Sequence, residues 1–402
     1  MEHRPDPEPE NTDIGGNYME IQVEKLRQTL DLVVAAIPRG KVKLPITTSV
    51  LFSDGKVMAT NLEYWISVNL PELGDLSFLL PYRALTEALK FTPGRETITL
   101  SPEEGRVVLA TSGSRLTLVK PGQPHDFPPM PQPAGDGFVV DGDRLVHGFL
   151  EVLPYVSTES ARPVLTAVAL KLGDELQMAT ADGFRLAIYQ PGIPLRGTDT
   201  GHIALVPGKA AQVLGGLWRK GDKPPDIDAA AIVGETTNGG PEQGRRGGSV
   251  HIGRLAVAKR NLRLVEDGNH IRFSFGSISL CSHLIQGEFP NYTHLVPVTE
   301  GGRRVMVHAE ELLRAVNQVA EIASEGSNIA RLRWSAGQLV ISARAADIGE
   351  AEVSIRAVVE GEDGEIAFNL RNLQQYLRGK TDIVTIATVP GDDAQVRGTP
   401  GV

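Results

Sequence analysis

The chain contains little cysteine, few aromatic residues and no long apolar run. Cys281 is the only cysteine among 402 residues, which excludes an internal disulfide framework and a four-cysteine zinc site and favours a reducing cytoplasm. No stretch approaches the roughly 18 apolar residues of a membrane helix, and the first residues carry no apolar secretory segment. The net charge of −9 argues against nucleic-acid binding over the whole surface but leaves room for a local basic surface.

The familiar signatures of catalysis are also absent from the sequence. There is no GxxxxGK[ST] phosphate loop, no GxGxxG, no GxSxG and no HExxH. The histidines never fall at metal-ligand spacing, and the carboxylate pairs Asp226/Asp228 and Asp392/Asp393 lie in Gly/Pro-rich sequence typical of solvated loops. We therefore expect no catalytic residue, no metal site and no cofactor.

Internal repetition is the most informative feature of the chain. One pattern, in which alternating strands surround a turn rich in Asp or Gly, occurs over residues 50–63, 168–187 and 332–344. A segment with helical periodicity precedes each copy, at residues 23–37, 143–155 and 309–324. A second pattern, in which a strand runs into a helix and more strands follow, begins at residues 78, 203 and 366.

These repeats predict three similar domains of α+β class, each built of two helix-plus-antiparallel-strand halves. The expected organisation is a disordered tail at 1–17, domain 1 at 18–134, domain 2 at 135–298 and domain 3 at 299–402. Domain 2 carries a Gly/Pro-rich insertion at 221–249, which we expect to be a flexible surface segment. Domain 3 lacks the sequence expected for its last strand.

Positive charge gathers near the predicted helices, whereas acidic residues crowd into the tail and the strand edges. If all the helices lined one surface, that surface would be basic on an acidic protein. The alternative is that these residues are ordinary solvated helix faces. The helix over 309–325 favours the alternative, because its glutamates outnumber Arg314.

Several phrases, in their order along the chain, resemble the bacterial DNA polymerase III beta subunit family, the β sliding clamps. Domain 1 contains Lys43-Leu-Pro-Ile-Thr-Thr-Ser, Ser112-Gly-Ser-Arg-Leu-Thr-Leu and His125-Asp-Phe-Pro. Domain 2 contains Arg162-Pro-Val-Leu-Thr, Ala181-Asp-Gly-Phe-Arg-Leu-Ala and Leu284-Ile-Gln-Gly-Glu-Phe-Pro. Domain 3 contains Glu311-Leu-Leu-Arg-Ala-Val and Gly349-Glu-Ala-Glu-Val. The resemblance extends from residue 19 to about residue 397 and is interrupted by the insertion.

The resemblance implies a DNA clamp fold and a ring-forming, head-to-tail homodimer that encircles double-stranded DNA. Such a ring slides because contacts to phosphates carry no sequence information. It has no catalytic activity of its own and serves DNA replication by tethering the polymerase for processivity. By location, the expected DNA-binding residues are Arg39, Lys41, Lys43, Arg83, Lys90, Lys209, Arg219 and Lys220.

The resemblance also implies two protein interfaces. The dimer interface joins an edge strand of domain 1 to one of domain 3, with Arg115, Leu116, Ile322, Glu350 and Glu352. DNA polymerases and clamp loaders bind through short linear motifs to a pocket formed by Leu165, Asp182, Gly183, Phe184, Arg185, Leu186, Pro290, His294 and Leu295. This sequence departs from the family at Phe184, where histidine is common, and at His294, where arginine is usual.

The family's C-terminal strand, which forms the other wall of that pocket, has no counterpart in this sequence. An alternative hypothesis is therefore a clamp-fold interaction scaffold for a plasmid, phage or repair system with an altered partner pocket. A third possibility, an unrelated α+β enzyme, has no nominated residue to support it.

Overall fold

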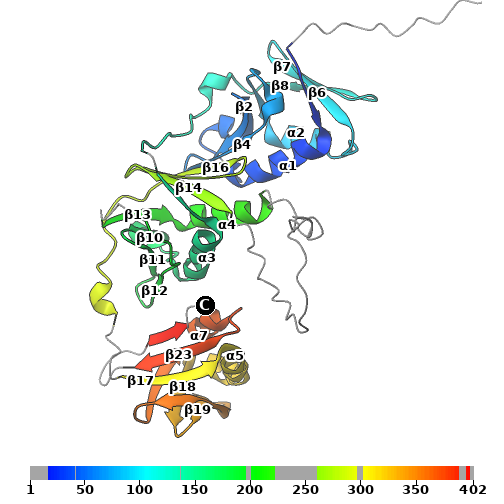
Figure 1. The fold of residues 1–402 in the computed structure, drawn as a ribbon. Coiled ribbons are helices and arrows are strands. Elements are labelled where there is room, and N and C mark those ends of the chain that lie inside the picture. Colours follow the sequence, from blue (N-terminus) through cyan, green and yellow to red (C-terminus); the bar gives the residue numbers. More distant parts are fainter. Residues whose placement is uncertain are drawn as a thin grey trace, which may run out of the picture. The chain divides into compact units, whose positions relative to one another are not determined.

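The computed structural model describes residues 17–40, 42–135, 137–195, 201–221, 260–296 and 302–388, and the backbone of 395–398. These residues form two compact units, with the boundary between Phe289 and Pro290 (Figure 1). No helix in these ranges has the length and apolar character needed to cross a membrane.

The first repeat of the N-terminal unit has two halves, and each half runs strand, helix and three strands. The first half consists of β1 (Met19–Gln22), α1 (Val23–Val33), β2 (Ser49–Ser53), β3 (Lys56–Thr60) and β4 (Tyr64–Asn69). The second half consists of β5 (Phe78–Pro81), α2 (Tyr82–Leu89), β6 (Thr97–Glu103), β7 (Arg106–Ala110) and β8 (Arg115–Val119).

The second repeat follows the same order within the same unit. Its first half consists of β9 (Phe138–Asp141), α3 (Gly142–Val152), β10 (Ala167–Leu172), β11 (Leu176–Ala181) and β12 (Leu186–Tyr189). Its second half consists of β13 (His202–Pro207), α4 (Gly208–Lys220), β14 (Asn261–Glu266), β15 (His270–Phe275) and β16 (Ile278–His283).

The third repeat forms the C-terminal unit. Its first half consists of β17 (Arg303–His308), α5 (Ala309–Gln318), α6 (Ala320–Glu325), β18 (Ile329–Ser335), β19 (Gln338–Ala345) and β20 (Gly349–Arg356). The rest consists of β21 (Val358–Glu360), β22 (Gly364–Asn369), α7 (Leu370–Leu377), β23 (Ile383–Thr388) and β24 (Gln395–Gly398). In the part of the chain that is described, two strands follow α7. The prediction about a last strand stays a prediction, because 399–402 lie outside that part.

The two halves of every repeat exchange their first strands. In the first repeat β1 pairs with β6 and β5 pairs with β2, so each half completes the other's sheet. The same exchange joins β9 to β14 and β13 to β10, and then β17 to β23 and β22 to β18. All of these pairings are antiparallel, as the sequence pattern predicts. Each repeat is therefore held together by strand pairing between its two halves.

The first two repeats share one continuous sheet. Strand β4 pairs with β16, which produces the eight-stranded order β5-β2-β3-β4-β16-β15-β14-β9. We call this β4–β16 pairing the internal seam. The domain boundary expected near residue 134 consequently lies inside one compact unit. The insertion predicted at 221–249 lies outside the described residues, apart from Gly221.

The cores form because each helix presents a narrow apolar stripe to the sheets. On α1, Leu26, Leu30 and Val33 recur at helical spacing and are buried. They join residues from both repeats in one continuous core of the N-terminal unit. A second core, which includes the fully buried Trp334, lies within the C-terminal unit.

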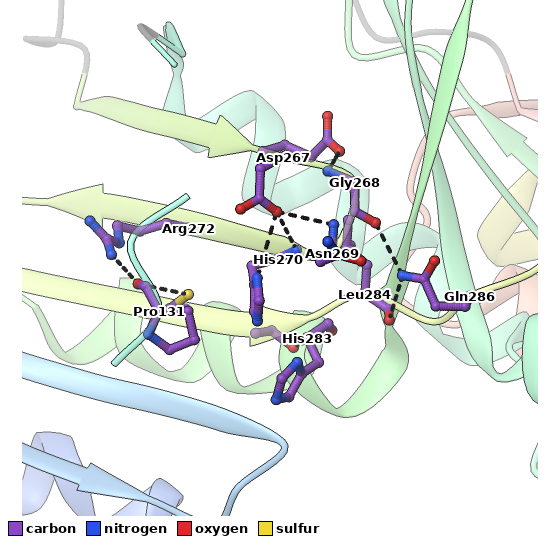
Figure 2. A network of polar contacts seen from close by, with 12 residues as sticks. Pro131, Asp267, Gly268, Asn269, His270, Arg272, His283, Leu284 and Gln286 are labelled. Carbon is purple, nitrogen blue, oxygen red and sulfur yellow. Dashed lines mark hydrogen bonds and ion pairs between the residues drawn. The ribbon is translucent and has the colours of Figure 1, made fainter. Parts of the chain in front are cut away.

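The segment that connects the first two repeats is fixed across the internal seam. Its Pro131 carbonyl accepts hydrogen bonds from the Arg272 guanidinium and, at 3.6 Å, from the Cys281 thiol (Figure 2). The nearby Pro128 carbonyl accepts from Trp65 Nε1 at 3.2 Å. Cys281 is thus a buried structural thiol, and burial raises its pKa to about 11.

Candidate DNA and protein interfaces

Strand β8 is an edge strand with exposed apolar side chains. It pairs with β7 and ends its sheet in the described part of the chain. Leu116 is 42% exposed and Val119 is 72% exposed, while Leu118 packs partly against the core. Open edges of this kind favour pairing with another strand unless charge or a cover protects them. Two of the expected interface residues, Arg115 and Leu116, lie on this strand.

Strand β20 is the corresponding edge in the C-terminal unit. Its inward side chains Ala351, Val353 and Ile355 pack partly against the same core as Ile322. Its outward side chains Glu350 and Glu352 are exposed. The other three expected interface residues therefore lie together at one edge of this unit.

The internal seam shows how this chain joins one repeat to the next. Its ladder runs antiparallel and pairs Ile278 with Val68, Leu280 with Ile66, and Ser282 with Tyr64. Here the last strand of a first half, β4, meets the last strand of a second half, β16. Strands β20 and β8 hold these same two positions in the third and first repeats. The two open edge strands, β8 and β20, therefore correspond to β16 and β4, the two strands that pair with each other inside the chain.

Six of the nine expected pocket residues are brought together in the N-terminal unit. Leu165, which is 5% exposed, lies in the turn before β10, and Leu186 begins β12. The loop between β11 and β12 carries Asp182, Gly183, Phe184 and Arg185. Phe184 is 92% exposed.

The loop holds this exposed phenylalanine in a fixed turn. Asp182 Oδ1 accepts the backbone N–H groups of Phe184 at 3.0 Å and Arg185 at 3.1 Å, and its Oδ2 accepts from Arg185 Nε at 2.8 Å. Gly183 has φ +94°, which L-residues rarely adopt. Burial alone would raise the pKa of Asp182, but these hydrogen bonds outweigh burial and hold that pKa below its ordinary value.

Tyr155 supports the same loop, although the sequence did not identify it. The Arg185 guanidinium lies 5.0 Å from the centre of the Tyr155 ring and donates to the Pro154 carbonyl. Burial raises the pKa of Tyr155 to about 12. No motif signals this role, because Tyr155 ends the preceding helical segment and meets the loop only in the fold.

The remaining pocket residues, Pro290, His294 and Leu295, belong to the C-terminal unit. They are exposed, and Leu295 is 58% exposed in a short 3₁₀ turn. A pocket that combines them with the six residues of the N-terminal unit therefore remains a prediction.

All of the expected DNA-binding residues that fall in the described ranges are exposed. Arg83 and Lys90 lie on and just after α2, whereas Lys209, Arg219 and Lys220 lie on α4. Arg39 and Lys43 belong to the loop that follows α1. Lys41 lies outside the described residues.

Several of these cations have protein partners nearby. Lys90 Nζ lies 3.7 Å from Glu87, Lys209 Nζ lies 3.9 Å from Glu63, and Lys220 Nζ donates to the Asp31 carbonyl at 3.2 Å. These contacts are exposed and contribute little free energy, so the side chains are able to exchange them for contacts with the phosphates of DNA.

Arg260 adds a cation that the sequence did not single out. Its guanidinium lies 4.0 Å from the centre of the Trp218 ring and donates to the Trp218 carbonyl at 2.9 Å. It therefore lies at the C-terminal end of α4, where Arg219 and Lys220 are its neighbours. In sequence these cations are separated by the long insertion, so only the fold places them together.

Comparison with known proteins agrees with this architecture. Residues 294–378 match the family model described as "DNA polymerase III beta subunit, C-terminal domain". The beta sliding clamp of Synechococcus elongatus is 25% identical over 373 residues, covering 89% of each chain. The beta sliding clamp of Pseudomonas putida is also 25% identical, over 371 residues that cover 90% of this chain and 89% of that protein.

Solved structures show the same fold over nearly the whole chain. A DnaN sliding clamp from Pseudomonas aeruginosa aligns with TM-score 0.77 and 22% identity, covering 96% of this chain and 97% of that one. The DNA polymerase III beta subunit of Thermotoga maritima aligns with TM-score 0.73 and 20% identity, and the alignment covers 95% of this chain and 96% of that one. With its repeated βα halves and the matched C-terminal domain, the chain is similar to the DNA polymerase III beta subunit family along nearly its whole length.

Proposed function

We propose that this chain is a DNA sliding clamp, a non-catalytic ring of two copies that encloses duplex DNA and tethers a DNA polymerase. The proposal that two copies form a ring rests on the internal seam. One chain contains three repeats, and the junction between the first two is an antiparallel strand pair. If β8 of one copy pairs with β20 of the next, two head-to-tail copies close without leaving either strand open.

Chemical complementarity supports this closure. Leu116 and Leu118 would meet Ala351, Val353 and Ile355 on the side of the helices. Arg115 would lie on the outer side, where Glu352 is exposed and faces Ser342 in its own sheet. A cross-strand or diagonal ion pair of this kind contributes a modest free energy of association and mainly fixes the register of the two strands.

Contact with DNA is assigned to the exposed cations near α2 and α4. Phosphate contacts are independent of sequence and salt-sensitive, which suits a ring that must move along the duplex. The net charge of −9 disfavours adhesion of DNA elsewhere on the surface. Retention on DNA then depends on enclosure rather than on tight binding.

Partner binding is assigned to the fixed loop at Asp182–Arg185, with Leu165 and Leu186 beside it. An exposed Phe184 on a hydrogen-bonded turn can receive an apolar side chain of a linear motif at little cost in loop entropy. DNA polymerases and clamp loaders are the proposed partners, and the proposed location is the cytoplasm. The alternative of a clamp-fold scaffold is not favoured, because the relatives that cover 89% of the chain are named beta sliding clamps.

The test compares circular and linear DNA. The protein is diluted until it dissociates, mixed with nicked circular duplex, concentrated so that rings form, and separated by gel filtration in high salt. A sliding clamp co-elutes with the circles and is released once they are cut with a restriction enzyme. Equal loss from circular and linear DNA would contradict enclosure.

A further inference from the structure

Two histidines face each other across the hairpin of β15 and β16. His270 is the first residue of β15 and His283 is the last residue of β16, and the ladder places them directly opposite. The centres of the two rings lie 4.8 Å apart, and the ring planes are inclined by 41° (Figure 2). His283 is exposed and His270 is half-buried. The proposed contacts with DNA, with a second copy and with partner motifs use neither imidazole.

The distance between these rings suits two imidazoles that share one metal ion. Imidazole nitrogens bind Zn²⁺ at about 2.0–2.1 Å, and at neighbouring coordination positions this bond length places the two ring centres about 4.5–5.2 Å apart. The observed separation of 4.8 Å lies inside that interval. Side chains directly opposite in an antiparallel pair start from Cβ atoms about 4.5–5.5 Å apart on one face of the sheet. Both rings can therefore reach a common ion by rotation of the side chains alone.

Asp267 orients one of the two rings. Its Oδ1 lies 3.6 Å from His270 Nδ1 and also accepts the backbone N–H groups of Asn269 at 3.0 Å and His270 at 2.8 Å. A carboxylate at Nδ1 favours the tautomer with its proton there, which leaves the lone pair of Nε2 for an ion. Figure 2 shows Asp267 at one end of the His270 ring and His283 toward the other end. A carboxylate behind a histidine in this way is the usual second layer of a protein metal site.

The second ring is held by strand β4 across the internal seam. The backbone N–H of His283 donates to the Glu63 carbonyl at 3.1 Å, and the Trp65 ring meets the His283 ring edge to face with centres 5.1 Å apart. Arg272, the next outward residue of β15, would repel a cation, but its guanidinium donates to the Pro131 carbonyl and is held toward the connecting segment (Figure 2). The pair of imidazoles is therefore positioned from both sides.

The two nitrogen ligands determine which ions the site can take. In the described ranges no group of three or more His, Cys, Asp or Glu side chains could hold a metal ion, so water would complete the coordination here. Imidazole suits Zn²⁺, Ni²⁺ and Cu²⁺, of which Cu²⁺ binds most tightly, whereas Mg²⁺ and Ca²⁺ require oxygen ligands. Spacing along the chain predicted no such site, because the two histidines lie at opposite ends of a hairpin and meet only in the fold.

We infer that His270 and His283 form a binding site for one divalent transition-metal ion, with Asp267 as the positioning carboxylate. The ion would join β15 to β16 at the end of the hairpin that lies away from its turn. Because β16 is also one strand of the internal seam, a bound ion would stabilise that side of the seam. The site belongs to a single chain, so it stands or falls independently of the proposed ring.

Trp65 provides a local reporter, because Cu²⁺ bound at His283 would quench the fluorescence of an indole this close. Titration of the full chain with Cu²⁺ at pH 7.5 should give saturable quenching that EDTA reverses and that Mg²⁺ does not produce. Trp65→Phe should remove that component, since Trp218 and Trp334, the other two tryptophans, lie elsewhere. Quenching by Mg²⁺ as well, or no quenching of the wild type by Cu²⁺, would overturn the inference.

Substitution of the ligands assigns the site. His270→Gln and His283→Gln should each raise the dissociation constant for Cu²⁺ at least tenfold. His202→Gln is the matched control and should leave it unchanged, because His202 also lies on a strand beside a carboxylate, Glu266 at 3.1 Å. Quenching that persists in both ligand variants would reveal an adventitious ion only and overturn the inference.

Asp267→Asn tests the positioning role separately. Asparagine keeps an oxygen for the two backbone N–H groups of the turn but removes the charge behind His270. The variant should weaken Cu²⁺ binding about tenfold, the lower end of the usual effect of such a partner. Its urea midpoint without metal should match that of the wild type, which separates positioning of the ring from support of the turn. Unchanged affinity for Cu²⁺ would overturn the role of Asp267.

Discussion

Leu280 of β16 lies directly opposite Ile66 of β4, although the two residues belong to different repeats of the chain. Both are fully buried, so this pair closes one apolar core across two repeats. The same two strand types, β8 and β20, are left open in the described part of the chain. The seam inside one chain is thus the physical precedent for the contact proposed between two chains.

Leu116→Asp should weaken self-association at least tenfold. A charge on the inward face of β8 would have to be desolvated against the inward apolar side chains of β20, Ala351, Val353 and Ile355, when the strands pair. Analytical ultracentrifugation measures the dissociation constant. Val139→Asp is the matched control, because Val139 is also exposed on an edge strand, β9, which has no role in closure. A similar effect of both variants would argue against the β8–β20 contact.

Gly142→Ala should destabilise the N-terminal unit by about 1–3 kcal/mol, the usual cost of overpacking a core. A Cβ at Gly142 would lie 2.1 Å from the nearest atom of the Trp218 ring, so the indole or the start of α3 must move. Gly113→Ala is the control, because a Cβ there meets nothing within 4 Å. Urea unfolding followed by fluorescence measures both variants, and equal midpoints would refute the packing at Gly142.

Lys90→Gln combined with Lys209→Gln should make DNA binding less dependent on salt. Each phosphate contact removed should reduce the slope of log K against log salt by about 0.9. Fluorescence anisotropy with a short linear duplex gives the slope. Lys171→Gln, an exposed lysine on β10, serves as the control. An unchanged slope in the double variant would exclude these two lysines from the DNA contact.

The N-terminal unit should lose stability as the pH falls below about 6.5. Partial burial and the neighbouring His270, whose ring lies 4.8 Å from that of His283, lower the pKa of His283 (Figure 2). The unfolded chain therefore binds a proton more readily than the folded chain, so stability present above pH 6.5 is lost on acidification. Thermal unfolding between pH 7.5 and 5.5 measures this loss.

His283→Gln should flatten that dependence on pH, and His125→Gln should leave it unchanged because the His125 side chain is 81% exposed. Asp267 is the acidic group that faces the pair, and its carboxylate lies 3.6 Å from His270 Nδ1. If His283→Gln and the wild type respond identically to pH, the imidazole pair does not control this stability.

The sequence predicted the repeated architecture because periodicity and turn residues are local signals. The alternating segments at 50–63 and 332–344 became paired strands. Glu350 and Glu352 lie exposed on the edge strand β20, and their place in a dimer interface stays a prediction. The exchange of first strands between halves was not predicted, because strand pairing over long sequence separations leaves no trace in local pattern.

The site could be predicted only in part, for a similar reason. Phe184 was expected in a partner pocket from a phrase of sequence, but the hydrogen bonds that fix its turn depend on the fold. Arg260 and Tyr155 were missed because each gains its role from one neighbour, Trp218 or Arg185, that is distant in sequence.

Light scattering of the full chain over a range of concentrations tests the central claim most directly. A ring of two head-to-tail copies predicts a mass twice the 43.2 kDa of one chain at micromolar concentration, falling toward one chain on dilution. Leu116→Asp should shift that transition to higher concentration. A wild-type mass that stays at 43.2 kDa at every concentration would contradict closure of the ring, and with it the sliding mechanism.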